Sequence, residues 1–72
     1  MMTVFYASSK YAALQDRAGW VQLVRSDGEE KWLGGHSSDD VIRTVGAFAD
    51  LTGTISDAGI VALDLFLDGF YR

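Results

Sequence analysis

The chain has a single residue that titrates near neutral pH, His36, in the run Gly34-Gly35-His36-Ser37-Ser38, which two aspartates follow. A hydrolytic site would use this histidine as a general base beside a serine nucleophile, with a carboxylate to orient the ring. The partners in such a triad are normally brought together by the fold from separate segments, and no nucleophile-elbow motif surrounds these residues. We therefore interpret His36 as a solvated loop residue and expect no catalytic residue and no enzyme.

The same segment is a poor metal or nucleotide site. His36 with Asp39 or Asp40 offers at most three ligands, and the chain has no cysteine, no EF-hand loop and no H-E-x-x-H spacing. Gly34-Gly35 belongs neither to a P-loop nor to a G-x-G-x-x-G fingerprint. We expect no metal and no cofactor, and we rank an enzyme or small-ligand binder centred on His36 last among the alternatives.

Carboxylates in the second half of the chain form a more promising pattern. Asp57, Asp64 and Asp68 are spaced by seven and four residues, so they share one line of a helix. Asp50 ends a similar line on the preceding helical stretch. If the two helices lie antiparallel, we expect these four residues to form one solvent-facing acidic ridge. Such a ridge can occupy a basic groove that normally binds phosphates, although an ordinary solvated helix face has the same pattern.

Two tryptophans are further candidates for a binding surface. Trp20 and Trp32 fall on opposite arms of a predicted β-hairpin. If both point away from the helices, with Tyr6 or Tyr11 nearby, they form an aromatic patch of the kind that supplies binding hot spots. Burial of both indoles in the core is the alternative.

The last helical stretch is apolar around most of its circumference and includes Leu65 and Phe66. A helix of this kind is either central to its domain or shared with a partner. In so short a chain we expect part of it to be exposed in the monomer and covered by a target protein or in a homodimer. Complete coverage within the domain is the competing interpretation.

The first half of the chain is predicted to form a small antiparallel sheet. Two β-prone runs, 20–25 and 29–33, flank Asp27-Gly28, which is a strong hairpin signal, so we predict a hairpin over residues 20–33. A third strand is expected near residues 3–7, because a lone hairpin is only marginally stable. We expect a helix over 9–17 after it, while one long helix through both segments is the alternative.

The second half is predicted to form a two-helix hairpin over residues 39–52 and 57–70. Ser38 and Ser56 are expected to cap the two amino termini, and Gly53 is expected to end the first helix in a left-handed conformation. Gly46 and Gly59 lie inside the helices, where each costs about 1 kcal/mol relative to alanine. Close approach of the two helix backbones is the simplest reason for them.

These elements predict an α+β fold in one domain, residues 1–72, with the sheet packed on the helices. A chain of 72 residues without cysteine must rely on apolar burial for its stability. It shows no basic segment leading into a long apolar run at the amino terminus and no apolar stretch of ~20 residues. We therefore expect a cytoplasmic location.

The net charge of −4 is unevenly distributed along the chain. Acidic and basic residues cancel up to His36, so the whole net charge belongs to the second half. A surface of this sign repels nucleic-acid phosphates and anionic lipids, so we expect no direct nucleic-acid and no membrane partner.

The preferred function is a non-enzymatic protein-binding module. Its size and charge suit a small acidic regulator or inhibitor of a nucleic-acid-binding machine, for example a phage-encoded antagonist of host defence. The partner would then be another protein, such as a basic nucleic-acid-binding protein. A structural homo-oligomer, such as a homodimer that buries helix 57–70, is the second hypothesis.

Overall fold

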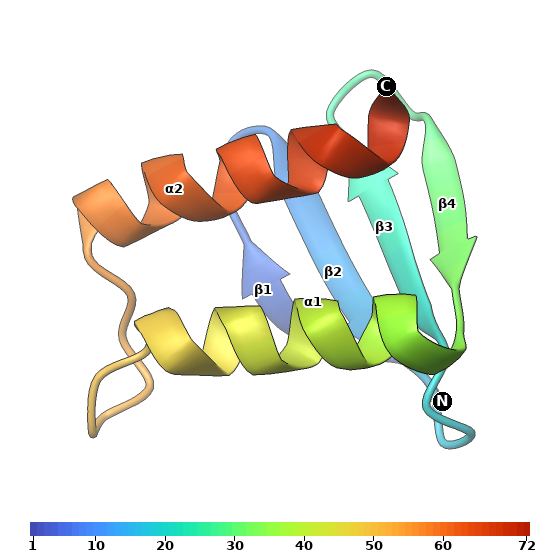
Figure 1. Ribbon diagram of the computed structural model, residues 1–72, viewed down its shortest axis with the longest axis horizontal. Helices are drawn as coiled ribbons and strands as arrows, with labels where there is room; N and C mark the ends of the chain where they lie inside the picture. Colours follow the sequence, from blue (N-terminus) through green and yellow to red (C-terminus); the bar gives the residue numbers. More distant parts are fainter.

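The computed structural model describes residues 1–72 and has an α+β fold, as predicted. Figure 1 shows a sheet with both helices on one of its faces, antiparallel and side by side. The sheet is an antiparallel meander with strand order β1-β2-β3-β4. Its elements are β1 (Thr3–Ala7), β2 (Tyr11–Gln15), β3 (Val21–Arg25), β4 (Glu30–Leu33), α1 (Gly35–Phe48), α2 (Asp57–Asp68) and a final 3₁₀ turn, η1 (Gly69–Tyr71).

The predicted hairpin and third strand are confirmed, but the helix expected over residues 9–17 is wrong. This segment forms strand β2, in which Tyr11 and Ala13 are buried and alternate with partly exposed residues. The turn before it is organised by Ser8, whose Oγ accepts hydrogen bonds from the backbone N–H groups of Lys10 and Tyr11. Because β2 pairs with strands on both sides, sheet hydrogen bonding overrides the helical spacing of its apolar residues.

A β-bulge in β1 decides which face its aromatic residues occupy. Val4 pairs with Leu14 but Tyr6 pairs with Ala13, so Phe5 is one extra residue in β1. Side chains alternate strictly along a regular strand, and the extra residue reverses that alternation. As a result, Tyr6 points into the core beside Ala13, while Val4 lies on the opposite face.

Helix α1 begins and ends about four residues earlier than predicted. Its N-cap is Gly34, and Ser38, the expected cap, is buried inside the helix with its Oγ donating to the carbonyl of Gly35. At the other end Asp50 accepts hydrogen bonds from the backbone N–H groups of Thr52 and Thr54, which closes a tight turn. Gly53 has a φ of 81°, but it belongs to this turn and not to the helix end.

Helix α2 begins as predicted. The Ser56 side chain accepts a hydrogen bond of 3.2 Å from the backbone N–H of Gly59. Gly59 is buried, and a Cβ at this position would lie 2.9 Å from the Ile55 side chain and 3.3 Å from the Phe48 ring, so neighbouring side chains, and not the backbone of α1, require its small size. Gly46 is exposed and faces open space, so close packing does not explain it.

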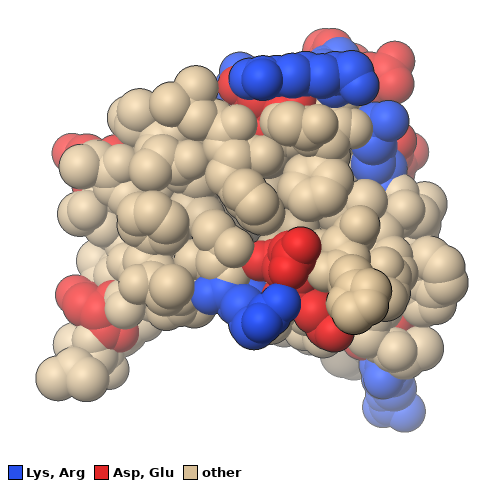
Figure 2. Space-filling model, in the orientation of Figure 1, with Lys and Arg blue, Asp and Glu red and all other residues tan.

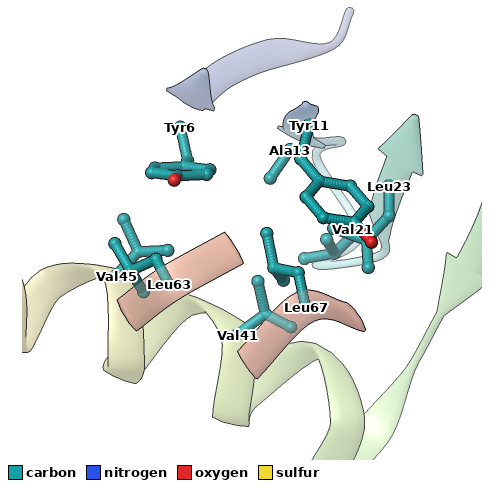
Figure 3. Packing of buried hydrophobic residues seen from close by; sticks show 9 residues of the cluster. All are labelled: Tyr6, Tyr11, Ala13, Val21, Leu23, Val41, Val45, Leu63 and Leu67. Atoms are coloured by element: carbon teal, nitrogen blue, oxygen red, sulfur yellow. The ribbon is translucent and has the colours of Figure 1, made fainter. Parts of the chain in front are cut away.

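The core lies between the sheet and the helix pair (Figure 3). Nine apolar side chains fill it, with those from the strands facing those from the helices: Tyr6, Tyr11, Ala13, Val21, Leu23, Val41, Val45, Leu63 and Leu67. The helical members recur at intervals of four residues, so each helix contributes one stripe. Neither helix combines the length and apolar character that a membrane crossing requires.

Two leucines in α2 provide a matched test of this packing. Leu63 is fully buried, whereas Leu65 is 60% exposed on the opposite side of the same helix. Leu63→Ala should lower the free energy of unfolding by about 2–5 kcal/mol through lost burial and the cavity that remains. Leu65→Ala should change it by less than about 1 kcal/mol. Urea denaturation followed by circular dichroism gives both values, and equal losses would contradict the assigned orientation of α2.

Candidate protein-binding surface

The sheet has a second face that no other element of the chain covers. Val21 and Leu23 point toward the helices and are fully buried, so the alternate residues Gln22 and Val24 point the opposite way. Strand register places the outward residues of the four strands on one surface, which we call the outer face. Its strand residues are Val4, Ala7, Ala12, Leu14, Gln22, Val24, Glu30 and Trp32, and Trp20, which directly precedes β3, borders it. Glu30 is the one charged residue among them.

Trp20 lies at the corner of the outer face where β3 begins and β4 ends. Asp16 accepts hydrogen bonds from the backbone N–H groups of Ala18 and Trp20, and this turn places the indole beside Gly34. A Cβ on Gly34 would lie 2.8 Å from the nearest indole carbon, so only glycine leaves room for the ring. The indole is still 48% exposed.

Trp32 lies next to this corner on β4. It is 54% exposed and directly opposite Gln22, whose side-chain amide donates to the Glu30 carboxylate on the same face. The structure therefore places both tryptophans at the surface, with Trp32 on the outer face and Trp20 at its corner, beside the start of α1. Tyr6 and Tyr11, which we expected near them, lie on the other face within the core.

The exposed edges of the sheet are poorly suited to pairing with another strand. Edge strand β4 has four residues and carries Glu30 and Lys31, while the other edge strand, β1, is interrupted by the bulge. Charged residues, short strands and bulges are the devices by which proteins block edge-to-edge pairing. The outer face is therefore a more suitable binding surface than either edge.

We expected the acidic line of α2 to face solvent, but it faces the sheet. Asp64 is half-buried and accepts hydrogen bonds from the Tyr6 hydroxyl at 2.7 Å and from the Ser8 Oγ at 2.8 Å. Asp68 accepts a hydrogen bond from the Tyr11 hydroxyl and pairs with Lys10 at 2.7 Å. These two aspartates join α2 to β1, β2 and the turn between them.

The other two residues of the predicted ridge lie elsewhere. Asp50 is held within its own turn by Thr52 and Thr54, and Asp57 is exposed in the first turn of α2. The four carboxylates therefore do not form one continuous solvent-facing line, because Asp64 and Asp68 serve as acceptors for sheet tyrosines. A role in binding a partner remains a prediction for each of them.

The hydrogen bonds to the aspartates also change the acidity of the groups involved. Burial, with a further contribution from the hydrogen bond to Asp64, raises the pKa of Tyr6 to about 12. Burial and the hydrogen bond to Asp68 raise the pKa of Tyr11 as well. The hydrogen bonds from Lys10 and then Tyr11 lower the pKa of Asp68, so it stays ionised in this contact.

Rotation of the acidic line toward the sheet leaves apolar residues on the outer side of α2. Val61 and Leu65 are 62% and 60% exposed. Phe66 is only partly exposed and packs edge-on against Phe70, with ring centroids 5.5 Å apart. Leu65 and Phe66 are the two apolar residues of α2 that we predicted to bind a partner. Leu65 is at the surface, whereas Phe66 mainly supports the core.

Charged residues are unevenly distributed over the folded surface. Figure 2 shows the helix side as largely uncharged, with basic and acidic side chains gathered at the edges and around one site in its lower half. Arg25 and Lys31 lie over the Tyr71 ring at 4.7 and 5.5 Å, and Lys10 is at the same end of the molecule. The hollow at this end is lined by three basic side chains, Lys10, Arg25 and Arg72, and by two acidic ones, Asp27 and Asp68, so the net negative charge lies on the rest of the surface.

His36 lies exposed in the first turn of α1 and not in a loop. Ser38 is buried and donates its hydroxyl to the Gly35 carbonyl, so it is not directed at His36. Asp40, one of the two aspartates considered as an orienting group, pairs instead with Arg43 at 2.9 Å. The neighbours of His36 in the sequence thus have separate structural roles.

The tyrosine contacts predict loss of the fold at high pH. All three tyrosines have a raised pKa in the folded chain, against about 10 for a free tyrosine. Their contribution to stability should be complete below pH ~10 and be lost as the pH rises toward 12 and beyond. Tyrosinate absorbance should therefore remain low near pH 10 and rise together with loss of helical circular dichroism. A tyrosine that ionises near pH 10 while the fold is intact would contradict this assignment.

Comparisons with protein-family models, curated proteins and solved structures yield no match to this chain. Its function is therefore inferred from its own surface. The geometry offers an apolar, aromatic sheet face and an apolar helix line, and both are surfaces on which another protein can pack.

Proposed function

We propose that this chain is a non-enzymatic protein-binding module that acts as a small regulator or inhibitor of a nucleic-acid-binding protein. The observation that carries the proposal is the pair of half-exposed tryptophans on the outer face of the sheet. Tryptophan is among the residues that contribute most to binding energy at protein interfaces. A pair of indoles at a sheet face with a single charged residue, Glu30, supplies the apolar centre that such an interface requires.

The fold also supports a binding role, because different residues form the core and the outer face. The helices and the inner face of the sheet supply the whole core, and the aspartates of α2 are used to attach that helix to the sheet. The outer face contributes no residue to that core, and it meets the helix layer where the Trp20 ring lies against Gly34, the N-cap of α1. Trp32, which is 54% exposed, is therefore available to a partner without loss of the core packing.

Charge indicates which kind of protein is bound. The chain has a net charge of −4 and would be drawn toward a positively charged protein. Proteins that bind nucleic acids present such surfaces, because arginine and lysine neutralise the phosphate backbone. A negatively charged module that covers such a surface would compete with nucleic acid for it.

Affinity capture with matched variants tests this proposal. Wild-type chain, the double variant Trp20→Ser with Trp32→Ser, and the control Val61→Ser are immobilised and exposed to the same cell extract. The wild-type chain and the control should retain the same nucleic-acid-binding protein, and the tryptophan variant should retain at least about tenfold less because the apolar centre is removed.

The retained protein is then purified and tested for nucleic-acid binding with and without the wild-type chain. The chain should reduce that binding, and the tryptophan variant should not. Equal capture by all three chains, or a partner whose nucleic-acid binding is unchanged, would contradict the proposal. Circular dichroism of the variants verifies that each is folded.

A homo-oligomer is a second candidate because α2 exposes Val61 and Leu65. These residues lie four apart, in line with Ala58, on the side of α2 that faces away from the core. Two copies of this line can pack against each other as an antiparallel helix pair.

Light scattering over a concentration series tests the second candidate. If α2 forms the interface, the wild-type chain should have twice the monomer mass, and Leu65→Asp should give a folded monomer, because a charge at the interface opposes association. Val4→Asp, a charge on the outer face of the sheet, is the matched control and should remain dimeric. A wild-type mass of one chain at every concentration would exclude this candidate.

A further inference from the structure

We infer that the outer face recognises arginine side chains of a basic protein segment, with the tryptophan rings as stacking surfaces and neighbouring carboxylates as counter-charges. This inference rests on the proposed function, because it names the chemistry of the partner at the same surface. It depends on which charged groups the fold places around the two indoles and on which of them are already neutralised.

Each indole has an acidic neighbour that forms no ion pair within the chain. Glu30 lies two residues before Trp32 on β4 and therefore on the same face of the sheet. Asp39 lines the same surface hollow as Trp20. The three ion pairs of the chain join Lys10 to Asp68, Arg25 to Asp27 and Arg43 to Asp40, so neither Glu30 nor Asp39 has a cationic partner.

The charge differs between the two indoles. Arg25 and Lys31 lie over the Tyr71 ring, on the helix side of the sheet, so neither neutralises Glu30. Arg17 belongs to the turn that leads into Trp20 and forms no ion pair, so its charge offsets that of Asp39 at this corner. The uncompensated negative charge is therefore that of Glu30, beside the exposed ring of Trp32.

Arginine is the side chain that matches both features. Its planar guanidinium stacks on an aromatic face, where the ring quadrupole attracts the cation, and tryptophan is the strongest partner for this contact. Its five N–H donors can reach a carboxylate at the edge of the ring at the same time. Lysine presents a compact, strongly hydrated ammonium and fits a stacked position less well.

Other occupants of the outer face fit its charge less well. A second copy of the chain would bring another Glu30 against the first, with like charges on both sides. Nucleic acid could stack bases on the indoles, but its phosphates would face the same carboxylates. A basic protein segment is the occupant that the surface favours.

Capped peptides of six arginines, six citrullines and six lysines provide the direct test. Citrulline keeps the shape and hydrogen bonding of arginine but has no charge. Because Trp20 and Trp32 are the only tryptophans, tryptophan fluorescence reports on this surface alone. Hexa-arginine should change the fluorescence with the highest affinity, hexa-lysine should bind several-fold more weakly, and hexa-citrulline should not bind. Added salt should weaken the arginine complex.

Three variants separate local recognition from net charge. Trp32→Leu keeps an apolar side chain without the aromatic ring and should weaken hexa-arginine binding about tenfold. Glu30→Gln keeps the size of the side chain without its charge and should weaken binding about two- to fivefold. Glu29→Gln makes the same change in net charge at the exposed residue just before β4, which is not part of the outer face, and should leave the affinity unchanged.

The possible failures of the two proposals are distinguishable. Equal binding of the arginine and citrulline peptides, or equal losses in Glu30→Gln and Glu29→Gln, would overturn arginine recognition. The proposed function would stand in that case if capture of the natural partner still depended on the tryptophans. If that capture is also unaffected by the tryptophan substitutions, both proposals fail.

Discussion

The arrangement of this domain depends on hydrogen bonds from two sheet tyrosines to two aspartates of α2. Tyr6 donates to Asp64 and Tyr11 donates to Asp68, from neighbouring strands to successive turns of the helix. These contacts fix the rotation of α2 about its axis. An aspartate turned toward the sheet needs such a donor, because a carboxylate removed from water without one is strongly unfavourable. The apolar residues on the other side of α2 are exposed as a direct result.

The same contacts explain the division between the two faces of the sheet. Once α2 is attached through its acidic line, the inner face of the sheet and the buried stripes of α1 and α2 form the complete core. None of the elements in residues 1–72 covers the outer face. The two tryptophans are consequently exposed on a rigid surface, which is the arrangement that a binding site requires.

Local signals in the sequence predict much of this fold. The Asp-Gly turn, the alternating residues around it, and the Ser56 cap all depend on nearby residues, and the structure confirms the hairpin and the start of α2. Strand β2 was missed because its apolar spacing also fits a helix, and only pairing with β1 and β3 decides between the two. The start of α1 was misplaced because Ser38 has the right chemistry for a cap but is needed in the core.

The candidate surface was only partly predictable for a related reason. The spacing of Asp57, Asp64 and Asp68 correctly places them on one side of a helix, but spacing cannot show which way that side faces. Their direction depends on tyrosines more than fifty residues away, and on a bulge that turns Tyr6 inward. The exposure of Trp20 and Trp32 likewise depends on which face of the sheet the helices cover, a long-range property that hairpin patterning does not contain.

Gly34 connects the candidate surface to the helix layer. This residue lies against the Trp20 indole and is also the N-cap from which α1 departs. A ligand that moves the indole therefore acts on the backbone at the first turn of α1, and the state of that turn acts in return on the position of the indole. By thermodynamic reciprocity, anything that stabilises the start of α1 in its present position also changes the affinity of the outer face. The surface and the helix are in this sense one coupled unit, linked through a residue that has no side chain.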